Sequence, residues 1–288
     1  MEARATRAAT GCKSERVRLG VSVPTARADG APLTGDALVG SARAIERAGF
    51  DSAWFFDAIG RGFMLPDPLI GASVAAAVTS RIELGTGVLQ VPLRNPVELA
   101  HRILTAHLVC NGRLLLGVGA GSTAGDFEAL GLDFAQRMRM LEESLATMRR
   151  LWRGEKVGAA DLTPWPTAMG GPAVLIGSWK GERWIPRAAR EFDGWIASGA
   201  KTSLQALTEG IGRYRAAGGK RAIVTNIAAD LSAPTEPLPD TAPFHLRCAP
   251  DAAARRLQQV RDLGFDDAVL VLKTATEAGL AAARALVR

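Results

Sequence analysis

The sequence predicts an α/β protein in which eight parallel strands, each followed by a helix, close into a single TIM barrel. Short apolar runs alternate with amphipathic helical stretches eight times along the 288 residues. These runs are continuously apolar, as is typical of strands buried on both faces of a parallel sheet. The first turn, residues 24–27 (PTAR), lacks the G-x-G-x-x-G pattern of the rival doubly wound fold.

The expected strands are short apolar segments, each bounded by residues that favour turns. They are residues 18–24, 52–57, 82–89, 113–120, 173–177, 194–198, 221–228 and 268–272. Continuous apolarity over such short lengths favours strands over helices, because helices in globular proteins are usually longer.

The helices of the first half are bounded by recognisable start and stop residues. Residues 36–48 carry apolar side chains at helical spacing, and Gly49 follows as a stop signal. A second helix is expected near residues 67–79, and Pro96 opens the third, at 97–109, in the position that proline prefers.

A long helix is expected at residues 134–152, followed by a Pro- and Gly-rich loop at 154–172. Its apolar residues are spaced three and four apart, which places them on one face. They are Met138, Leu141, Leu145, Met148 and Leu151. Together the helix and loop form an insertion between strands four and five.

The remaining helices follow strands five to eight in the same alternating order. They are expected at residues 182–190, 203–216, 251–263 and 277–287. The loop before strand eight, residues 234–250, is rich in proline, and we expect a shortened segment before strand eight. We expect one barrel domain over residues 18–288 and a flexible extension over residues 1–17.

Composition excludes several classes of function. The chain carries 35 basic and 29 acidic residues, a net charge of +6, without any block of five like charges, so nucleic acid is not an expected partner. No run of 18 apolar residues exists, so no membrane span is expected. The mild positive charge favours an anionic small-molecule ligand.

Cysteine and histidine are too few and too scattered for a metal site. The three cysteines, one of them Cys110, form no C-x-x-C pair, which indicates a reducing compartment, the cytoplasm. His101 and His107 lie six residues apart and therefore on different sides of one helix, and His101 is expected at the surface.

The active site of such a barrel lies at the C-terminal ends of its strands. Small residues dominate these ends, and glycine lets a backbone approach a flat ring or donate N–H groups to a phosphate. The segment from Gly177 to Gly181 also leads into a helix N-terminus, a favourable place for an anion. An equally weighted alternative is that these glycines only form the turns that any barrel needs.

Several segments resemble the luciferase-like monooxygenase superfamily, in the order that this family shows. Residues 82–101 (IELGTGVLQVPLRNPVELAH) and 112–122 (GRLLLGVGAGS) are similar to its third and fourth units. Residues 137–152, 176–178 and 187–195 continue the resemblance. It implies a barrel that holds a flavin-type ring at its mouth, most closely the branch using deazaflavin coenzyme F(420) for hydride transfer with a small organic substrate.

Other functions stay open alongside this one. A reduced-FMN-dependent monooxygenase is the first alternative, and a barrel that binds flavin without catalysis is the second. Lys273, at the end of strand eight, could form a Schiff base in a phosphate-sugar lyase, although an exposed loop lysine is favoured. The resemblance also implies a homodimer.

The resemblance implies cofactor-binding residues at three strand ends. They are Thr86, Gly87 and Val88, then Ala120 and Gly121, then Gly177, Ser178 and Trp179. The first group would form a bulge, often with a non-prolyl cis peptide, in which Gly87 and Val88 back the ring and Thr86 hydrogen-bonds near it. The second would flank the ring, and the third would donate to a phosphate.

The end of strand two departs from the family pattern. Many relatives have Asp-His there, whereas this chain has Asp57 and Ala58, so a proton donor of relatives is missing. Asp57 is the candidate catalytic acid or base if burial raises its pKa, with capping of the following turn as the equal alternative. Arg94 could clamp an anion, but a solvated loop cation is the favoured interpretation.

Overall fold

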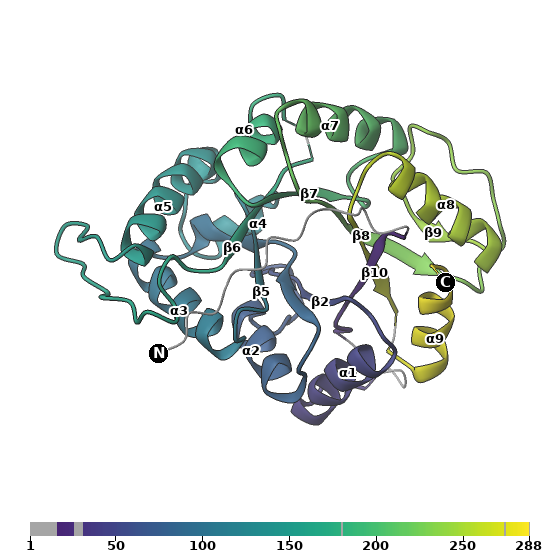
Figure 1. Ribbon diagram of the computed structural model, residues 1–288, viewed down its shortest axis with the longest axis horizontal. Coiled ribbons are helices and arrows are strands. Elements are labelled where there is room, and N and C mark those ends of the chain that lie inside the picture. The colour runs from purple at the N-terminus through teal and green to yellow at the C-terminus, as the bar shows by residue number, and fades with distance from the viewer. Residues whose placement is uncertain (1–15, 26–30, 180, 274, 288) are drawn as a thin grey trace, which may run out of the picture.

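A computed structural model describes residues 16–25, 31–179, 181–273 and 275–287 of the chain. Helices form an outer ring around a closed sheet (Figure 1). Most of the predicted N-terminal extension, residues 1–15, lies outside the described residues. The ring-and-sheet arrangement confirms the predicted TIM barrel.

The barrel consists of eight parallel strands, and the pairings of β10 with both β1 and β8 close it. Its strands are β1 (Arg18–Ser22), β2 (Ser52–Phe55), β3 (Glu83–Thr86), β5 (Leu114–Gly119), β6 (Ala173–Gly177), β7 (Gly194–Ser198), β8 (Ala222–Asp230) and β10 (Asp267–Leu272). Two short strands, β4 (Leu89–Gln90) and β9 (Leu246–Arg247), pair with β5 and β8 at the same end of the barrel.

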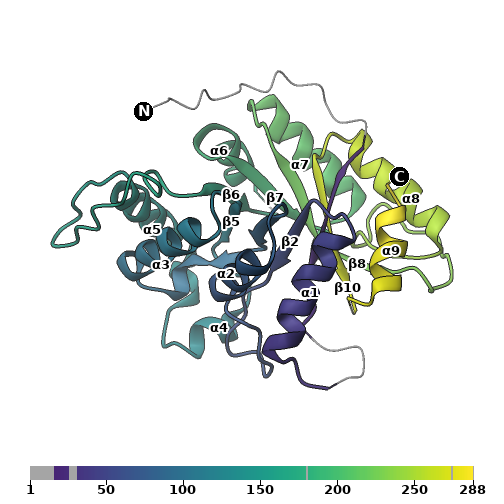
Figure 2. The same cartoon turned by 60° about the horizontal axis from the view of Figure 1, so that its bottom comes forward.

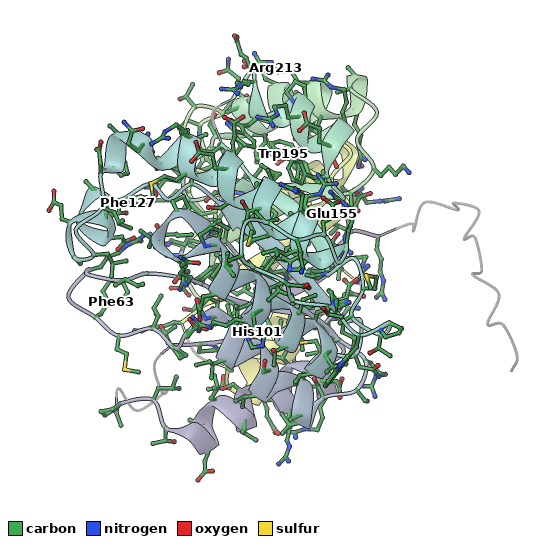
Figure 3. All side chains as sticks on the ribbon, turned by 90° about the vertical axis from the view of Figure 1, so that its left-hand side faces the viewer. Phe63, His101, Phe127, Glu155, Trp195 and Arg213 are labelled. Carbon is green, nitrogen blue, oxygen red and sulfur yellow. The ribbon has the colours of Figure 1, made fainter. Side chains whose placement is uncertain are left out.

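A helix follows each barrel strand, close to the predicted bounds. These helices are α1 (Gly35–Arg47), α2 (Pro68–Val78), α3 (Pro96–Val109), α5 (Arg137–Trp152), α6 (Trp184–Glu191), α7 (Leu204–Ala216), α8 (Pro250–Asp262) and α9 (Glu277–Ala285). Side chains that accept from first-turn N–H groups, such as Asp67 and Asn95, start several of them. His101 is exposed on α3, as predicted (Figure 3).

The insertion between β5 and β6 holds more structure than the sequence predicts. Besides α5 it contains the short helix α4 (Ala124–Glu128) and a 3₁₀ turn, η2 (Phe134–Gln136), and another such turn, η1 (Val91–Leu93), follows β4. These elements are too short to show helical periodicity. Figure 2 shows α4 beyond α3 and α5, at one end of the barrel.

The barrel interior is filled by side chains around Trp54. Trp54 packs with five aliphatic residues, Leu115, Leu175, Ile196, Ile223 and Val269. A Cβ added at Gly85 would lie 2.4 Å from the Trp54 ring, so β3 needs glycine beside it. The indole N–H donates to the Ser52 hydroxyl at 2.8 Å. These side chains close the barrel below its C-terminal mouth.

Four charged residues join the strands at the opposite, N-terminal end. Arg221 lies 2.7 Å from the Glu83 carboxylate and 2.9 Å from that of Asp267, and Arg18 lies 2.5 Å from Glu83. Because these residues belong to four different strand starts, the network fixes how the strands meet. Polar contacts at this end of a barrel serve stability rather than catalysis.

Acid is expected to weaken this network. Burial alone would raise the pKa of Glu83, but hydrogen bonds and charges from Arg221 and Arg18 lower it below its ordinary value. With the folded pKa below the unfolded value of about 4.3, the resulting stability is complete above that pH and is lost as pH falls through the folded value. Glu83→Gln should therefore lower the melting temperature at pH 7, and the difference from wild type should shrink below about pH 4.

Thermal unfolding followed by circular dichroism at pH 7 and 3.5 measures this difference. Glu143→Gln is the matched control, because Glu143 pairs with Arg139 at 3.1 Å on the exposed face of α5. Its effect should be close to zero at both pH values. An equal Glu83→Gln penalty at the two pH values would contradict the expectation.

Candidate functional site

A cavity of about 770 Å³ opens at the C-terminal mouth of the barrel. Its volume lies within the range typical of small-molecule and cofactor sites. All of the predicted site residues except Thr86 line it, namely Asp57, Gly87, Val88, Ala120, Gly121, Gly177, Ser178 and Trp179. The structure thus brings together strand ends that are up to 122 residues apart.

The cavity floor is shaped by an irregularity between β3 and β4. Gly85 pairs with Leu115, and Leu89 pairs with Val118, so one more residue lies on the β3–β4 side than on the β5 side. This is a β-bulge. The peptide bond between Gly87 and Val88 is cis, as the resemblance implied. Val88 emerges from the bulge onto the interior cluster around Trp54 and lines the cavity.

Two glycines hold the Val88 side chain from either side. A Cβ at Gly119 would lie 2.7 Å from one Val88 methyl, and a Cβ at Gly177 would lie 2.7 Å from the other. Both distances are shorter than real Cβ atoms tolerate. These glycines are therefore required by a side chain of the protein itself, a reason that the sequence did not reveal. We call Val88, held in this way, the Val88 ledge.

Thr86 differs from its predicted position. Its side chain is fully buried, and its hydroxyl donates to the Gly117 carbonyl at 2.6 Å. It does not belong to the cavity lining. The bulge turns Thr86 toward β5, so its hydroxyl ties the two strands together and is not available beside a ring.

Asp57 is engaged by its own protein on both carboxylate oxygens. Arg94 lies 2.6 Å from one oxygen and donates to the other at 3.0 Å, and the Gln90 N–H donates to the first at 2.8 Å. The side chains of Asp57 and Arg94 are only 3% and 10% exposed. The favoured interpretation of Arg94 as a solvated cation is therefore wrong, and the catalytic role of Asp57 stays a prediction.

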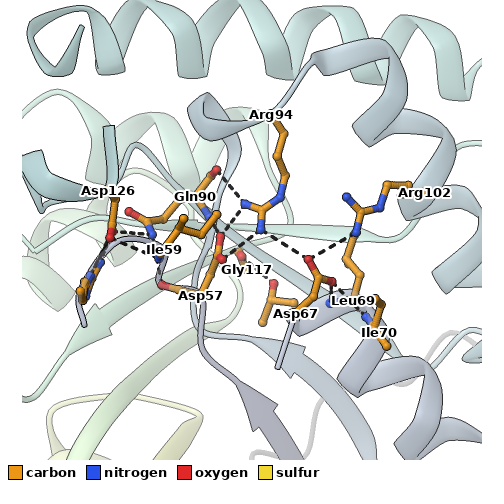
Figure 4. A network of polar contacts seen from close by, with 12 residues as sticks. Asp57, Ile59, Asp67, Leu69, Ile70, Gln90, Arg94, Arg102, Gly117 and Asp126 are labelled. Atoms are coloured by element: carbon orange, nitrogen blue, oxygen red, sulfur yellow. Dashed lines mark hydrogen bonds and ion pairs between the residues drawn. The ribbon is translucent and has the colours of Figure 1, made fainter. Parts of the chain in front are cut away.

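The Gln90 side chain extends this contact toward α4. Its amide nitrogen donates to the Asp57 carbonyl at 3.1 Å and to the Asp126 carboxylate at 2.9 Å (Figure 4). Asp126 is fully buried, and its carboxylate also forms an ion pair with the Arg61 guanidinium at 2.5 Å. Burial raises the pKa of Asp126, but hydrogen bonds from Arg61 and Gln90 bring it below its ordinary value.

Sequence reasoning did not find this network. On the other side of Asp57, Arg94 also approaches Asp67 at 3.5 Å, and Asp67 approaches Arg102 of α3 at 3.3 Å (Figure 4). The partners are separated by more than thirty residues, and no local motif marks them. The network fixes Gln90, two residues after Val88, and thereby the position of the ledge.

The prediction that Ser178 donates its backbone N–H to a phosphate needs a correction. The Ser178 N–H donates to the Ile196 carbonyl at 3.1 Å as part of the sheet, so an anion cannot use that donor. The Ser178 carbonyl accepts from the Trp195 indole at 2.8 Å. Helix α6 begins at Trp184, which lines the cavity, without a side-chain cap. In its first turn the Ile185 N–H already donates to the Gly181 carbonyl at 3.3 Å and Pro186 has no N–H, so this turn offers an anion fewer donors than an ordinary helix start.

The cavity lining is positively charged. Its only acidic member among the described residues, Asp57, is paired with Arg94, and Arg61 is paired with Asp126. The other cations are Arg137, Lys201 and Lys273, none of which has a carboxylate partner among the described side chains. This charge favours an anionic ligand, as the composition predicted.

Two further features concern the described part of the chain as a whole. It contains no group of three or more histidine, cysteine, aspartate or glutamate side chains arranged to hold a metal ion. Within the same residues, every helix falls short of the length or the apolar character required to cross a bilayer.

Comparison with known proteins points to one family. The sequence model described as luciferase-like monooxygenase matches residues 17–233. An uncharacterised protein of Mycobacterium tuberculosis is 31% identical over 185 residues, which span 60% of this chain and 63% of that protein. The chain thus aligns with less than two thirds of the length of this curated relative.

Solved structures share the fold over nearly the whole chain. The monooxygenase RslO1 of Streptomyces bottropensis superposes with a TM-score of 0.76 at 19% identity, covering 94% of this chain and 97% of that one. The coenzyme F(420)-dependent tetrahydromethanopterin reductase of Methanopyrus kandleri gives 0.73 at 15% identity, covering 94% and 98%.

Proposed function

The chain belongs to the luciferase-like monooxygenase family, and from that premise we propose that it is an oxidoreductase using the deazaflavin coenzyme F(420). It would transfer a hydride between this coenzyme and a small organic substrate in the cavity at the barrel mouth. The observation that carries the proposal is the Val88 ledge, an apolar support at the floor of a cationic cavity.

The residues present fit such a group. The cavity volume of about 770 Å³ accommodates a ring with a side chain. Val88 would support one face of a ring, while Ala120 and Gly121 present little side-chain bulk beside it. Arg137 would supply hydrogen-bond donors and positive charge for a phosphate.

When bound, the deazaflavin supplies the carbon that gives or accepts the hydride. The protein contributes position and a sheltered cavity. The ledge would cover one face of the ring and confine a substrate to the other face. Phe63 and Leu65, on the loop after β2, line the cavity, and their apolar side chains would limit the access of water to a bound ring. Figure 3 shows Phe63 on this loop at the edge of the molecule.

Asp57 is assigned a positioning role in this proposal. Its carboxylate already accepts hydrogen bonds from Arg94 and the Gln90 N–H. The residue that follows it, Ala58, has no side-chain group that can donate a proton. Asp57 would hold Gln90, and through it the Val88 ledge, at the correct height beneath a ring.

A reduced-FMN-dependent monooxygenase is the second candidate, and the fold similarity to the monooxygenase RslO1 favours it. Anaerobic titration separates the possibilities: saturable quenching of deazaflavin fluorescence supports the first, and tight binding of reduced FMN alone supports the second. Binding without hydride transfer to any of a broad panel of enones, alcohols and imines would indicate a non-catalytic barrel. We also propose a homodimer, which light scattering after gel filtration tests.

Ala120→Trp should abolish cofactor binding, because the indole fills the space beside the ledge. We expect the dissociation constant for coenzyme F(420) to rise at least about 100-fold, corresponding to roughly 2.7 kcal/mol. Ala216→Trp, at the exposed end of α7, is the matched control and should bind normally. Fluorescence titration provides the measurement, and unchanged affinity of Ala120→Trp would show that the ring lies elsewhere.

A further inference from the structure

We propose that Lys201, Asn226 and Lys273 form a subsite for an anionic group of the substrate, a carboxylate or a phosphate. This inference rests on the proposed function and narrows it to substrates that carry a negative charge. All three residues line the mouth cavity.

Strand order places these residues side by side. β7, β8 and β10 are consecutive neighbours in the sheet. Lys201 follows β7, Asn226 lies within β8, and Lys273 follows β10 directly. Asn226 therefore stands between the two lysines, at the end of the barrel where parallel strands direct their carboxyl termini.

Asn226 occupies an unusual backbone conformation at this point. Its φ is +56°, in the left-handed region that few residues other than glycine adopt. The pairing of β8 with β10 shifts register there, because Ala268 pairs with Val224 whereas Leu270 pairs with Ile227. A bulge of this kind redirects a side chain and is common beside active sites. Asn226 is consequently turned toward the cavity.

The lysine charges are not used by the protein itself. Within the described part of the chain, neither ammonium group has an ion pair or hydrogen bond. By contrast, Arg61 is bound by Asp126, and Arg137 stacks 4.0 Å from the Phe134 ring and donates to its carbonyl. The Asn226 amide donates one N–H to the Thr225 hydroxyl at 3.2 Å and keeps a second N–H. Two exposed lysines and this remaining amide N–H are a suitable set for an oxyanion, and all three residues line the cavity in which a substrate would lie.

The position opposite the ledge assigns this subsite to the substrate. In the eight-strand order β1, β2, β3, β5, β6, β7, β8, β10, strand β8 stands four places from β3 and thus directly across the mouth. A ring resting on Val88 would turn its free face toward Asn226. A substrate between them would meet the ring with its reacting carbon and the lysines with its anionic end.

Anion binding is tested first on the protein without cofactor. The melting temperature is measured in 20 mM inorganic phosphate, in 20 mM acetate and in chloride at equal ionic strength. We expect a rise with phosphate or acetate in the wild type and its loss in the double variant Lys201→Met/Lys273→Met. Lys220→Met removes an exposed lysine at the opposite end of the barrel, before β8, and should keep the rise. A larger rise with phosphate indicates a phosphate ester, and a larger rise with acetate indicates a carboxylate.

The second measurement compares charged and neutral substrates. In a panel of alcohols, their phosphate esters and hydroxy acids, we expect the wild type to turn over anionic members with a KM at least about tenfold lower than that of neutral ones. The double methionine variant should lose this preference, whereas Lys201→Arg/Lys273→Arg should retain most of it. Asn226→Ala should raise KM for anionic substrates with a smaller change in kcat.

Two outcomes separate this inference from the proposed function. If deazaflavin fluorescence is quenched equally in the wild type and the double methionine variant, but neither anion raises the melting temperature and neutral substrates are preferred, the subsite is refuted and the function stands. If the anion effects follow the lysines while deazaflavin does not bind, the anion subsite stands and the hydride-transfer function is refuted.

Discussion

Gly117→Ala is expected to destabilise the barrel by about 3 kcal/mol or more, at the upper end of what a single added methyl group costs in a packed core. A Cβ at this position would lie 2.0 Å from the Thr86 carbonyl oxygen and 2.6 Å from the Ile196 side chain. The carbonyl belongs to the backbone of the bulge, so the clash cannot be relieved by rotating a side chain. Either β5 or the bulge must shift.

Thermal and urea unfolding measure the loss. At roughly 2–4 °C per kcal/mol for a protein of this size, the melting temperature should fall by about 6–12 °C. Gly40→Ala is the matched control: Gly40 lies in α1 with open space around its Cα, so alanine there should stabilise by up to about 1 kcal/mol. A Gly117→Ala variant as stable as the wild type would show that the bulge yields easily.

A double-mutant cycle on Asp57 and Arg94 should give the second large effect. Removing either charge leaves its partner buried without full compensation, which typically costs about 3–5 kcal/mol. Asp57→Asn and Arg94→Met should each be severely destabilised, and combining them should recover about 1–3 kcal/mol of the summed loss. The same cycle on the exposed pair Arg150 and Glu155 should yield less than about 1 kcal/mol.

The cycle also decides between the two roles of Asp57. A positioning residue acts through the ledge, so the hydride-transfer rate should fall in both single variants and recover partly in the double variant. A catalytic acid or base would leave the double variant as inactive as Asp57→Asn. Single-turnover rates with bound coenzyme distinguish these results. Recovery of stability without recovery of rate would restore the catalytic interpretation of Asp57.

The local pattern of apolar residues is sufficient to predict most helices and strands of this protein. Strands at residues 173–177 and 194–198 were predicted to the residue, because their continuous apolarity ends at turns. The strand expected over residues 82–89 is instead broken at the bulge into β3 and β4. Nothing in its apolar pattern marks the break, because a bulge depends on the register with β5.

Only two parts of the site can be predicted from the sequence: the residues at the strand ends, and the roles that the family resemblance implies for them. Fold topology alone brings Gly87, Gly121 and Gly177 to one cavity, so their location followed from counting strands. The contact of Asp57 with Arg94 spans 37 residues and required the folded coordinates. The burial of Thr86 likewise depends on how the bulge turns, which no sequence motif encodes.

The packed interior beneath Val88 determines the order in which ligands bind and leave. Trp54 and the five aliphatic side chains packed around it obstruct passage from the N-terminal end, so any ligand of the cavity must enter and leave at the strand ends. Whichever molecule rests on the floor must arrive first and depart last. Steady-state kinetics should accordingly follow a compulsory sequence, with the substrate as the second to enter and its product as the first to leave.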